Sequence, residues 1–165
     1  MWNLAVLGVL ISLAGYYAGA DRGAGATLRR AGADSLAEGM ALYRDAVARY
    51  FAGHAGGGSS VDLAALRASH ALPDWSPLHD AAATTIWTNY RDAAGTIYIY
   101  AARPPADNIV ADIVRLSRNS VLAGVYRKGD STLYSPVFGD TRIALPTPAE
   151  AAIPDRSPVW IVAAQ

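Results

Sequence analysis

The sequence contains no cysteine, and this absence excludes disulfides, thiolate metal sites, iron–sulfur clusters and cysteine nucleophiles. It also lacks an excess of charge, because 14 basic and 14 acidic side chains give a formal net charge of zero. A neutral chain has no long-range field that would attract nucleic acid, so we expect no nucleic-acid partner. Charged residues make up only 17% of the 165 residues and apolar residues 52%, which is typical of one globular domain rather than a disordered chain.

The sequence also lacks the motifs that would identify an enzyme. Its three histidines are His54, His70 and His79, and no two have the i, i+4 spacing of a zinc-binding helix. A nucleophile elbow, a Ser-x-x-Lys pair and a phosphate-binding lysine loop are all missing. The one suggestive pair is His79-Asp80, close to Trp75. Trp75 and Trp87 are expected to fill the core, and Trp160 is expected to be a core residue or, as the alternative, an interface anchor. The sequence therefore predicts no catalytic residue, no metal site and no cofactor.

Long apolar runs are not lacking. Residues 2–20 carry no charge, and as a helix they would extend for about 28 Å, close to the thickness of a bilayer core. Trp2 at one end and Tyr16 and Tyr17 near the other are typical of side chains at the level of the lipid headgroups. We expect residues 1–20 to form a retained transmembrane anchor.

A cleaved signal peptide is the alternative to a retained anchor. Ala18-Gly19-Ala20 fits the small-residue rule for a cleavage site, and the mature chain would then begin at Asp21. The segment Met1-Trp2-Asn3 carries no basic residue, which favours the anchor. The basic residues nearest the span follow it, and the positive-inside rule alone would place the rest of the chain in the cytoplasm.

Small residues recur within the apolar segment at spacings of four, three and four. This arrangement places them on one face of a helix, and it includes a small-xxx-small pattern that lets two membrane helices approach closely. Helix pairing through this face would give a homodimer, whereas the abundance of glycine and alanine throughout the chain is the plainer explanation. The residues of the predicted pairing face are Gly8, Ser12, Gly15 and Gly19.

An amphipathic helix is predicted within residues 21–58, between the anchor and the domain that follows. Its apolar positions recur at helical spacing from residue 36 to residue 51, and Gly53 and the glycine run 56–58 mark its end and a flexible linker. The apolar stripe would pack either against its own domain or against the helix of a partner. The residues of this predicted partner-helix face are Leu36, Met40, Tyr43, Val47 and Tyr50.

Residues 59–165 are predicted to form an α+β domain. A short helix is expected over about 60–70, with Ser59 and Asp62 in capping-box spacing, and a second helix from Asp107 to about Arg118. Each helix precedes a predicted pair of strands, and aliphatic and tyrosine residues alternate along 96–100, so the two sheet faces should differ. The expected strands are 84–91, 96–102, 121–127, 131–135, 141–145 and 158–162.

This order of elements favours a ferredoxin-like fold. A repeated helix–strand–strand unit packs as a sandwich with an antiparallel sheet and with both helices on one sheet face. The alternative is a pilin-like architecture, in which one long N-terminal helix packs against an antiparallel sheet.

Several segments together resemble one known family, the short PilM family of plasmid-type (type IVB, thin-pilus) systems, which differs from the actin-like protein of the same name. The resemblance implies a non-enzymatic inner-membrane component of the type IV pilus assembly machine, serving pilin transport or the basal body. It also implies a periplasmic domain whose partners are other assembly platform proteins and pilin, contrary to the charge bias. The segments are Met40-Ala41-Leu42-Tyr43-Arg44 leading to Tyr50-Phe51, Ser60-Val61-Asp62-Leu63-Ala64-Ala65-Leu66, Trp87-x-Asn89-Tyr90, Gly95-Thr96-Ile97-Tyr98-Ile99-Tyr100-Ala101, Leu116-Ser117-x-Asn119-Ser120-Val121-Leu122-Ala123-Gly124 and Ile153-Pro154-Asp155-x-Ser157-Pro158-Val159-Trp160.

Two other functions compete with a scaffold role. A pilin-like subunit of the fibre would need a prepilin junction, and Gly39-Met40 resembles one only superficially, because no hydrophobic run follows. A small envelope enzyme or ligand-binding domain would need polar side chains that converge in a cleft, for example His79, Asp80 and Arg91 in a deep pocket.

Overall fold

The computed structural model describes residues 32–54, 59–80 and 82–163. Within these ranges no helix is both long and apolar enough to cross a membrane. The predicted anchor over residues 1–20, with its small-residue face of Gly8, Ser12, Gly15 and Gly19, lies outside them, as does the glycine run 56–58. The predicted amphipathic helix is described from residue 32, together with most of the domain that follows it.

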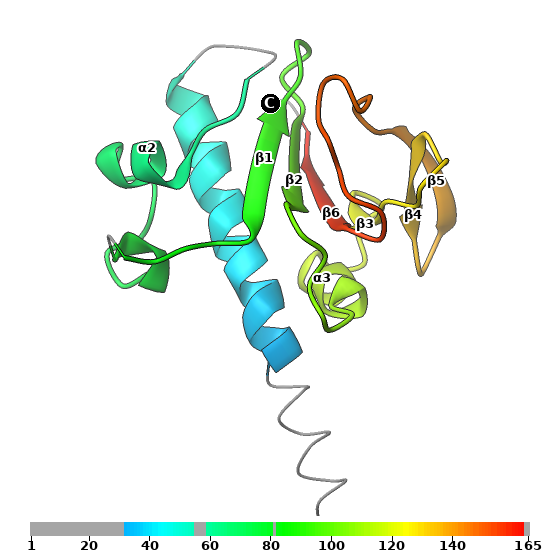
Figure 1. The fold of residues 1–165 in the computed structure, drawn as a ribbon, viewed down its shortest axis with the longest axis horizontal. Coiled ribbons are helices and arrows are strands. Elements are labelled where there is room, and N and C mark those ends of the chain that lie inside the picture. The colour runs from blue at the N-terminus through cyan, green and yellow to red at the C-terminus, as the bar shows by residue number, and fades with distance from the viewer. Residues whose placement is uncertain (1–31, 55–58, 81, 164–165) are drawn as a thin grey trace, which may run out of the picture.

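The described chain is α+β, with helices and a six-stranded antiparallel sheet (Figure 1). The amphipathic helix covers residues 32–53 and is called the long helix below. The shorter helices are α2 (Leu63–Ala68), the single 3-10 turn η1 (Pro77–His79) and α3 (Val110–Leu116). The strands are β1 (Trp87–Arg91), β2 (Ile97–Ala101), β3 (Ala123–Val125), β4 (Thr132–Ser135), β5 (Gly139–Ala144) and β6 (Pro158–Val162).

The sheet has the order β1-β2-β6-β3-β4-β5, and all neighbouring strands in it are antiparallel. Both predicted hairpins form, but β6, the last strand in the chain, lies between them. The predicted ferredoxin-like repeat of helix, strand and strand has no strand between its two hairpins, so the observed sheet order differs from it in the position of β6. Residue 124 of β3 is a glycine, and a Cβ at this position would collide with the Tyr134 carbonyl of β4. The glycine therefore allows β3 and β4 to lie this close together. Val125↔Tyr134 is the register pair that joins β3 to β4.

One face of the sheet is covered by helices. The long helix and α3 share a single buried core with β1, β2 and β6, in which Met40, Val47, Ile99 and Ile113 are fully buried. α2 lies beside the long helix, beyond the β1 edge (Figure 1). Two helices therefore cover one sheet face, as predicted. One of them is the long helix, whereas the prediction expected the short helix near residue 60 in this position. Such a long helix against an antiparallel sheet is the feature that the pilin-like alternative predicts.

The apolar stripe of the long helix faces its own domain. Met40, Tyr43 and Val47 are buried in the core on the sheet, and Leu36 and Tyr50 are partly buried against it. Of the two roles predicted for this stripe, packing against its own domain is the one seen in the described structure, and contact with a partner helix stays a prediction. The helix also belongs to the same folded unit as the strands, so the predicted division at residues 58 and 59 does not separate two cores.

A buried amide fixes the long helix and the segment before α2 to β1. Asn89 Nδ2 donates to the Tyr43 hydroxyl and to the Val61 carbonyl, each at 2.7 Å, and Asn89 Oδ1 accepts from the Val61 N–H at 3.0 Å. Asn89 is almost fully buried, so these bonds satisfy polar groups that water cannot reach. Burial raises the pKa of Tyr43 to about 12, although the bond from Asn89 acts in the opposite direction.

The other face of the sheet is covered by a loop. Tyr98 and Tyr100 of β2 lie in a second core with Val159, Ile161 and residues of the segment between β5 and β6. That segment contributes Leu145, Ala151 and Ile153. Odd and even residues of β2 thus enter different cores, which confirms the alternation predicted from residues 96–100.

The predicted N-terminal starts of α2 and α3 are both wrong. Asp62, not Ser59, is the N-cap of α2 and accepts the Ala65 N–H at 2.7 Å. Ser59 instead forms a β-bridge with Arg91, which takes its backbone out of the helix start. Asp107 is not the N-cap of α3, because that helix begins after Ile109.

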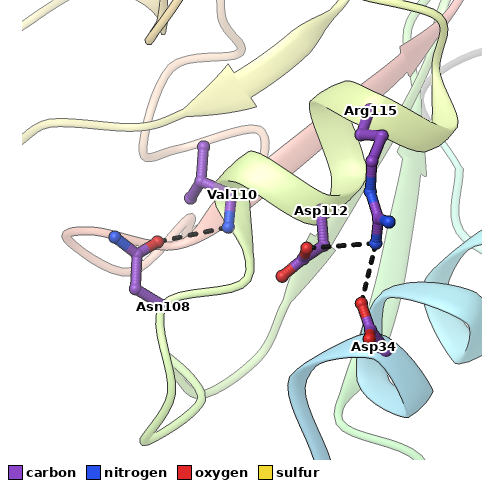
Figure 2. A network of polar contacts seen from close by, with 5 residues as sticks. All are labelled: Asp34, Asn108, Val110, Asp112 and Arg115. Atoms are coloured by element: carbon purple, nitrogen blue, oxygen red, sulfur yellow. Dashed lines mark hydrogen bonds and ion pairs between the residues drawn. The ribbon is translucent and has the colours of Figure 1, made fainter. Parts of the chain in front are cut away.

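A surface ion pair joins the two helices of the helix-covered face (Figure 2). Arg115 of α3 donates to Asp34 of the long helix at 2.7 Å and to Asp112 at 3.2 Å. Asn108 Oδ1 accepts the Val110 N–H at the start of α3. The Arg115–Asp34 contact joins the last turn of α3 to the beginning of the described part of the long helix.

Candidate interaction surface

The residues proposed for a catalytic cluster contact different partners. His79 Nε2 lies 4.0 Å from Asp74 Oδ1, Asp80 accepts the Ala82 N–H, and Arg91 donates to the His54 carbonyl. Among the described residues no group of three or more histidine and acidic side chains is placed to hold a metal ion. The prediction that Trp75 is a core residue is wrong, because Trp75 lies in the loop before η1 with 72% of its surface exposed. Trp87 and Trp160 are buried as predicted.

A groove with a volume of about 870 Å³ lies at the end of the sheet where β6 begins. One wall is the segment from Pro104 to the first residues of α3, and the other is formed by the ends of β3 and β4. Asp155, Arg156 and Pro158 complete it. We call the groove lined by all of these segments the end groove. Its size lies within the range of known ligand sites, and four prolines give it rigid apolar sides.

Three cationic side chains line the end groove. The Arg127 guanidinium stacks over the Tyr134 ring, 3.1 Å from its centre. Lys128 and Arg156 are exposed to solvent, and Arg156 has a positive φ of 59°. Two acids, Asp107 and Asp155, also line the groove. Asp155 accepts the backbone N–H of Lys128 at 2.6 Å, and its carboxylate also lies 4.0 Å from the Arg156 guanidinium.

An exposed apolar hairpin tip adjoins the end groove. Pro136 lines the groove, and the next two residues, Val137 and Phe138, are 55% and 52% exposed. They form the turn between β4 and β5, which closes through Gly139 with a positive φ of 72°. Figure 1 shows this hairpin on the side of the sheet away from the long helix. Paired large apolar side chains at a hairpin tip are typical of contact with a partner.

Both edges of the sheet carry features that limit the pairing of a further strand. Ser59 bridges Arg91 on the β1 edge through two backbone hydrogen bonds. On β5 a register shift interrupts the ladder, and Arg142 has a positive φ of 57°. Asp140 accepts the Arg142 N–H and the Thr132 hydroxyl, and these bonds lower the pKa of its carboxyl group. Bulges of this kind are typical of edges that do not add a further strand.

Two smaller grooves of about 410 and 380 Å³ follow the long helix at the opposite end of β6. The first contains Arg44, which pairs with Asp45 and stacks over Trp160 at 4.2 Å. The charge of Arg44 is thus compensated within the chain. Two exposed apolar residues, Leu116 and Val121, are next in the chain to lining residues of the first groove.

None of the end-groove cations was singled out by the sequence. Arg127, Lys128 and Arg156 lie on two segments that are far apart in the chain, and only the fold brings them together. A local signal did exist for the hairpin tip, since Val137 and Phe138 are large apolar residues in a turn between two predicted strands.

These features define an α+β domain with no assembled catalytic or metal cluster in its described parts, and with a groove and an apolar tip suited to binding another protein. A family model described as PilM matches residues 9–161, and the chain therefore belongs to the PilM family. This is the plasmid-type family rather than the actin-like one, as the resemblance implied.

A solved structure has a similar fold. The crystal structure of a protein described as putative PilM from Escherichia coli B7A superposes with a TM-score of 0.52 at 20% sequence identity. The match covers 81% of this chain and 93% of that one. At this identity the likeness shows the fold alone. No curated protein matches the chain.

Proposed function

We propose that the protein is a non-enzymatic component of a type IV pilus assembly machine at the bacterial inner membrane, and that it works by protein–protein contact. The observation that carries this proposal is the PilM family match over residues 9–161. The role is either pilin transport or a scaffold of the basal body. Its partners are other assembly platform proteins and pilin.

In this proposal residues 1–20 form a single membrane span, and the domain lies in the periplasm. The uncharged length of residues 2–20 supports the span. Pairing of two spans through Gly8, Ser12, Gly15 and Gly19 would give a homodimer. The basic residues after the span favour the opposite orientation, but a short-range charge bias governs translocation imperfectly, so the family resemblance has more weight.

Deletion of the coding region tests the role. We expect loss of thin pili, counted by electron microscopy of the cells, and restoration by the full chain expressed in trans. Normal piliation of the deletion strain would contradict the proposal.

Two measurements on the complemented strain test the location. Extraction of membranes with alkaline carbonate should leave the chain in the pellet, and sequencing of its N-terminus should find residue 1 or 2. In spheroplasts, added protease should digest the domain. A soluble product beginning at Asp21, or a domain protected from protease, would contradict the anchor or the periplasmic location respectively.

A pilin-like subunit of the fibre is the second candidate, and the long helix on an antiparallel sheet favours it. Sheared and purified pili distinguish the two functions. A scaffold stays with the cells, whereas a subunit is present in the sheared fraction in proportion to pilin.

A further inference from the structure

We propose that the end groove and the apolar hairpin tip beside it form one docking surface, which binds an extended acidic segment of another protein of the pilus assembly machine. This inference rests on the proposed function and adds to it the place of contact and the chemistry of the partner. Two independent observations carry it: an excess of cations in the groove, and two exposed apolar side chains next to it.

The charges of the groove fit an acidic partner. Arg127, Lys128 and Arg156 face two acids, Asp107 and Asp155, which leaves one cation in excess, and the ion pair between Arg156 and Asp155 is exposed and 4.0 Å long. Stacking on the Tyr134 ring fixes the Arg127 guanidinium without neutralising it. Carboxylates form charge-assisted hydrogen bonds with such groups, and opposite potentials across an interface guide association. Because the whole chain is neutral, this local excess stands out from its surroundings.

The shape of the groove fits an extended segment. Its walls are largely apolar and include Pro104, Pro105, Val110 and Val125, which carry no side-chain hydrogen-bonding group. Beyond Pro136 the surface continues to Val137 and Phe138. A partner segment that places carboxylates in the groove would bring its own apolar side chain to Phe138. Aromatic and cationic anchors of this kind contribute most of the binding energy in protein interfaces.

The same features disfavour two other occupants. A second copy of this chain, meeting groove to groove around a two-fold axis, would bring together two grooves that each carry one cation in excess. An anionic lipid headgroup would use the cations but would leave the apolar walls and the hairpin tip uncovered.

Photocrosslinking in cells tests the surface directly. Benzoylphenylalanine replaces Phe138 in the full-length chain, expressed in the deletion strain that also carries the rest of the pilus system. After irradiation, the crosslinked product is isolated through a tag on this chain, and mass spectrometry identifies the attached peptide. We expect one assembly protein, attached through a segment that carries at least two carboxylates beside an apolar residue.

Matched variants test the charges. The double variant Lys128→Glu/Arg156→Glu reverses two exposed cations of the groove, and Arg49→Glu reverses an exposed cation on the long helix. We expect the double variant to lower the crosslink yield by about tenfold or more and to reduce piliation, and the Arg49 control to change neither. Changing the acidic residues of the crosslinked segment to lysine should restore the yield with the double variant. Equal thermal unfolding of all variants shows that the domain is intact.

Each other outcome contradicts the inference. Attachment to a second copy of this chain, to lipid, or to a segment without carboxylates would replace the proposed partner with another. Normal piliation and an undiminished crosslink in the double variant would show that the groove is not used. If the deletion abolishes pili while every groove variant supports them, the docking surface is wrong and the proposed function stands; normal pili in the deletion strain contradict the function itself.

Discussion

The two faces of the sheet are buried in different ways. On the helix-covered face the long helix and α3 cover β2 and β6, and the buried Asn89 amide ties three segments together. On the loop-covered face an irregular segment between β5 and β6 covers a row of tyrosines. Helices cover one face of the sheet along the length of its strands, whereas the loop covers only part of the other face.

This difference explains where the interaction surface lies. The hairpin tip lies at the side of β4 and β5, away from the long helix, and the end groove lies between the ends of β3 and β4 and the segment that leads from Pro104 into α3. The β4–β5 hairpin is joined to β3 through one register pair, so it is held less extensively than β1 or β2. The helix-covered face thus stabilises the domain, and the hairpin side presents side chains to a partner.

Loss of the Asn89 amide should have the largest effect, because it acts at the centre of the helix-covered face. Asn89→Leu leaves the Tyr43 hydroxyl and both backbone groups of Val61 without their partner. At about 1–3 kcal/mol for each unsatisfied buried group, we expect the free energy of unfolding to fall by about 3 kcal/mol or more. Urea denaturation of the purified chain measures it. Asn108→Ala, which removes an exposed amide, is the control and should cost about 1 kcal/mol or less. A similar loss in both variants would contradict the central role of Asn89.

Cavity-forming substitutions on the two faces should differ in how much of the domain they open to amide hydrogen exchange. Met40 and Leu133 are both fully buried, one on each face. Met40→Ala should lower the free energy of unfolding by about 2–5 kcal/mol and increase amide exchange throughout the domain. Leu133→Ala creates its cavity in β4, so exchange should increase first in β4 and β5, because one register pair holds that hairpin to β3. Hydrogen exchange measured by mass spectrometry separates the two patterns. Uniform exchange in the Leu133 variant would show that the hairpin is not an independent unit.

High pH should weaken both faces. Burial raises the pKa of Tyr43 on the helix-covered face to about 12. On the loop-covered face burial and the nearby Asp92 carboxylate raise the pKa of Tyr98 to about 12. In each case the folded pKa exceeds the value of 10 in the unfolded chain, so the stabilisation is fully present below pH 10 and is lost as pH rises towards 12. Tyr98→Phe should make the decline in melting temperature between pH 10 and 12 shallower, and an unchanged decline would contradict this assignment.

The strands could be predicted from the sequence because their signal is local. The run Pro158-Val159-Trp160-Ile161-Val162 gave the bounds of β6, and the alternation along 96–100 gave the two different faces of β2. The sheet order could not be predicted in the same way. Placing β6 between the two hairpins depends on pairing with β2 and β3, which are more than 30 residues earlier in the chain.

The candidate surface was less predictable than the fold, for a related reason. The end groove combines four separate segments of the chain, so no spacing in the sequence could indicate it. Trp75 shows the opposite error, since a large aromatic residue is usually buried, and here the loop before η1 leaves it exposed. The apolar stripe of the long helix was found correctly, but periodicity alone does not say whether such a stripe meets its own sheet or a partner.

The smallest effect is expected at the ion pair between the two helices (Figure 2). Arg115 has 66% of its side chain exposed while it contacts Asp34 and Asp112, and exposed pairs contribute about 0.2–1 kcal/mol. Arg115→Ala should therefore lower the free energy of unfolding by no more than about 1 kcal/mol at low salt, and the difference from the unchanged chain should vanish near 1 M salt, where screening is strong. A larger loss, or one that persists at high salt, would mean that the two helices depend on this contact. The helix-covered face would then be held by its surface charges as well as by its core.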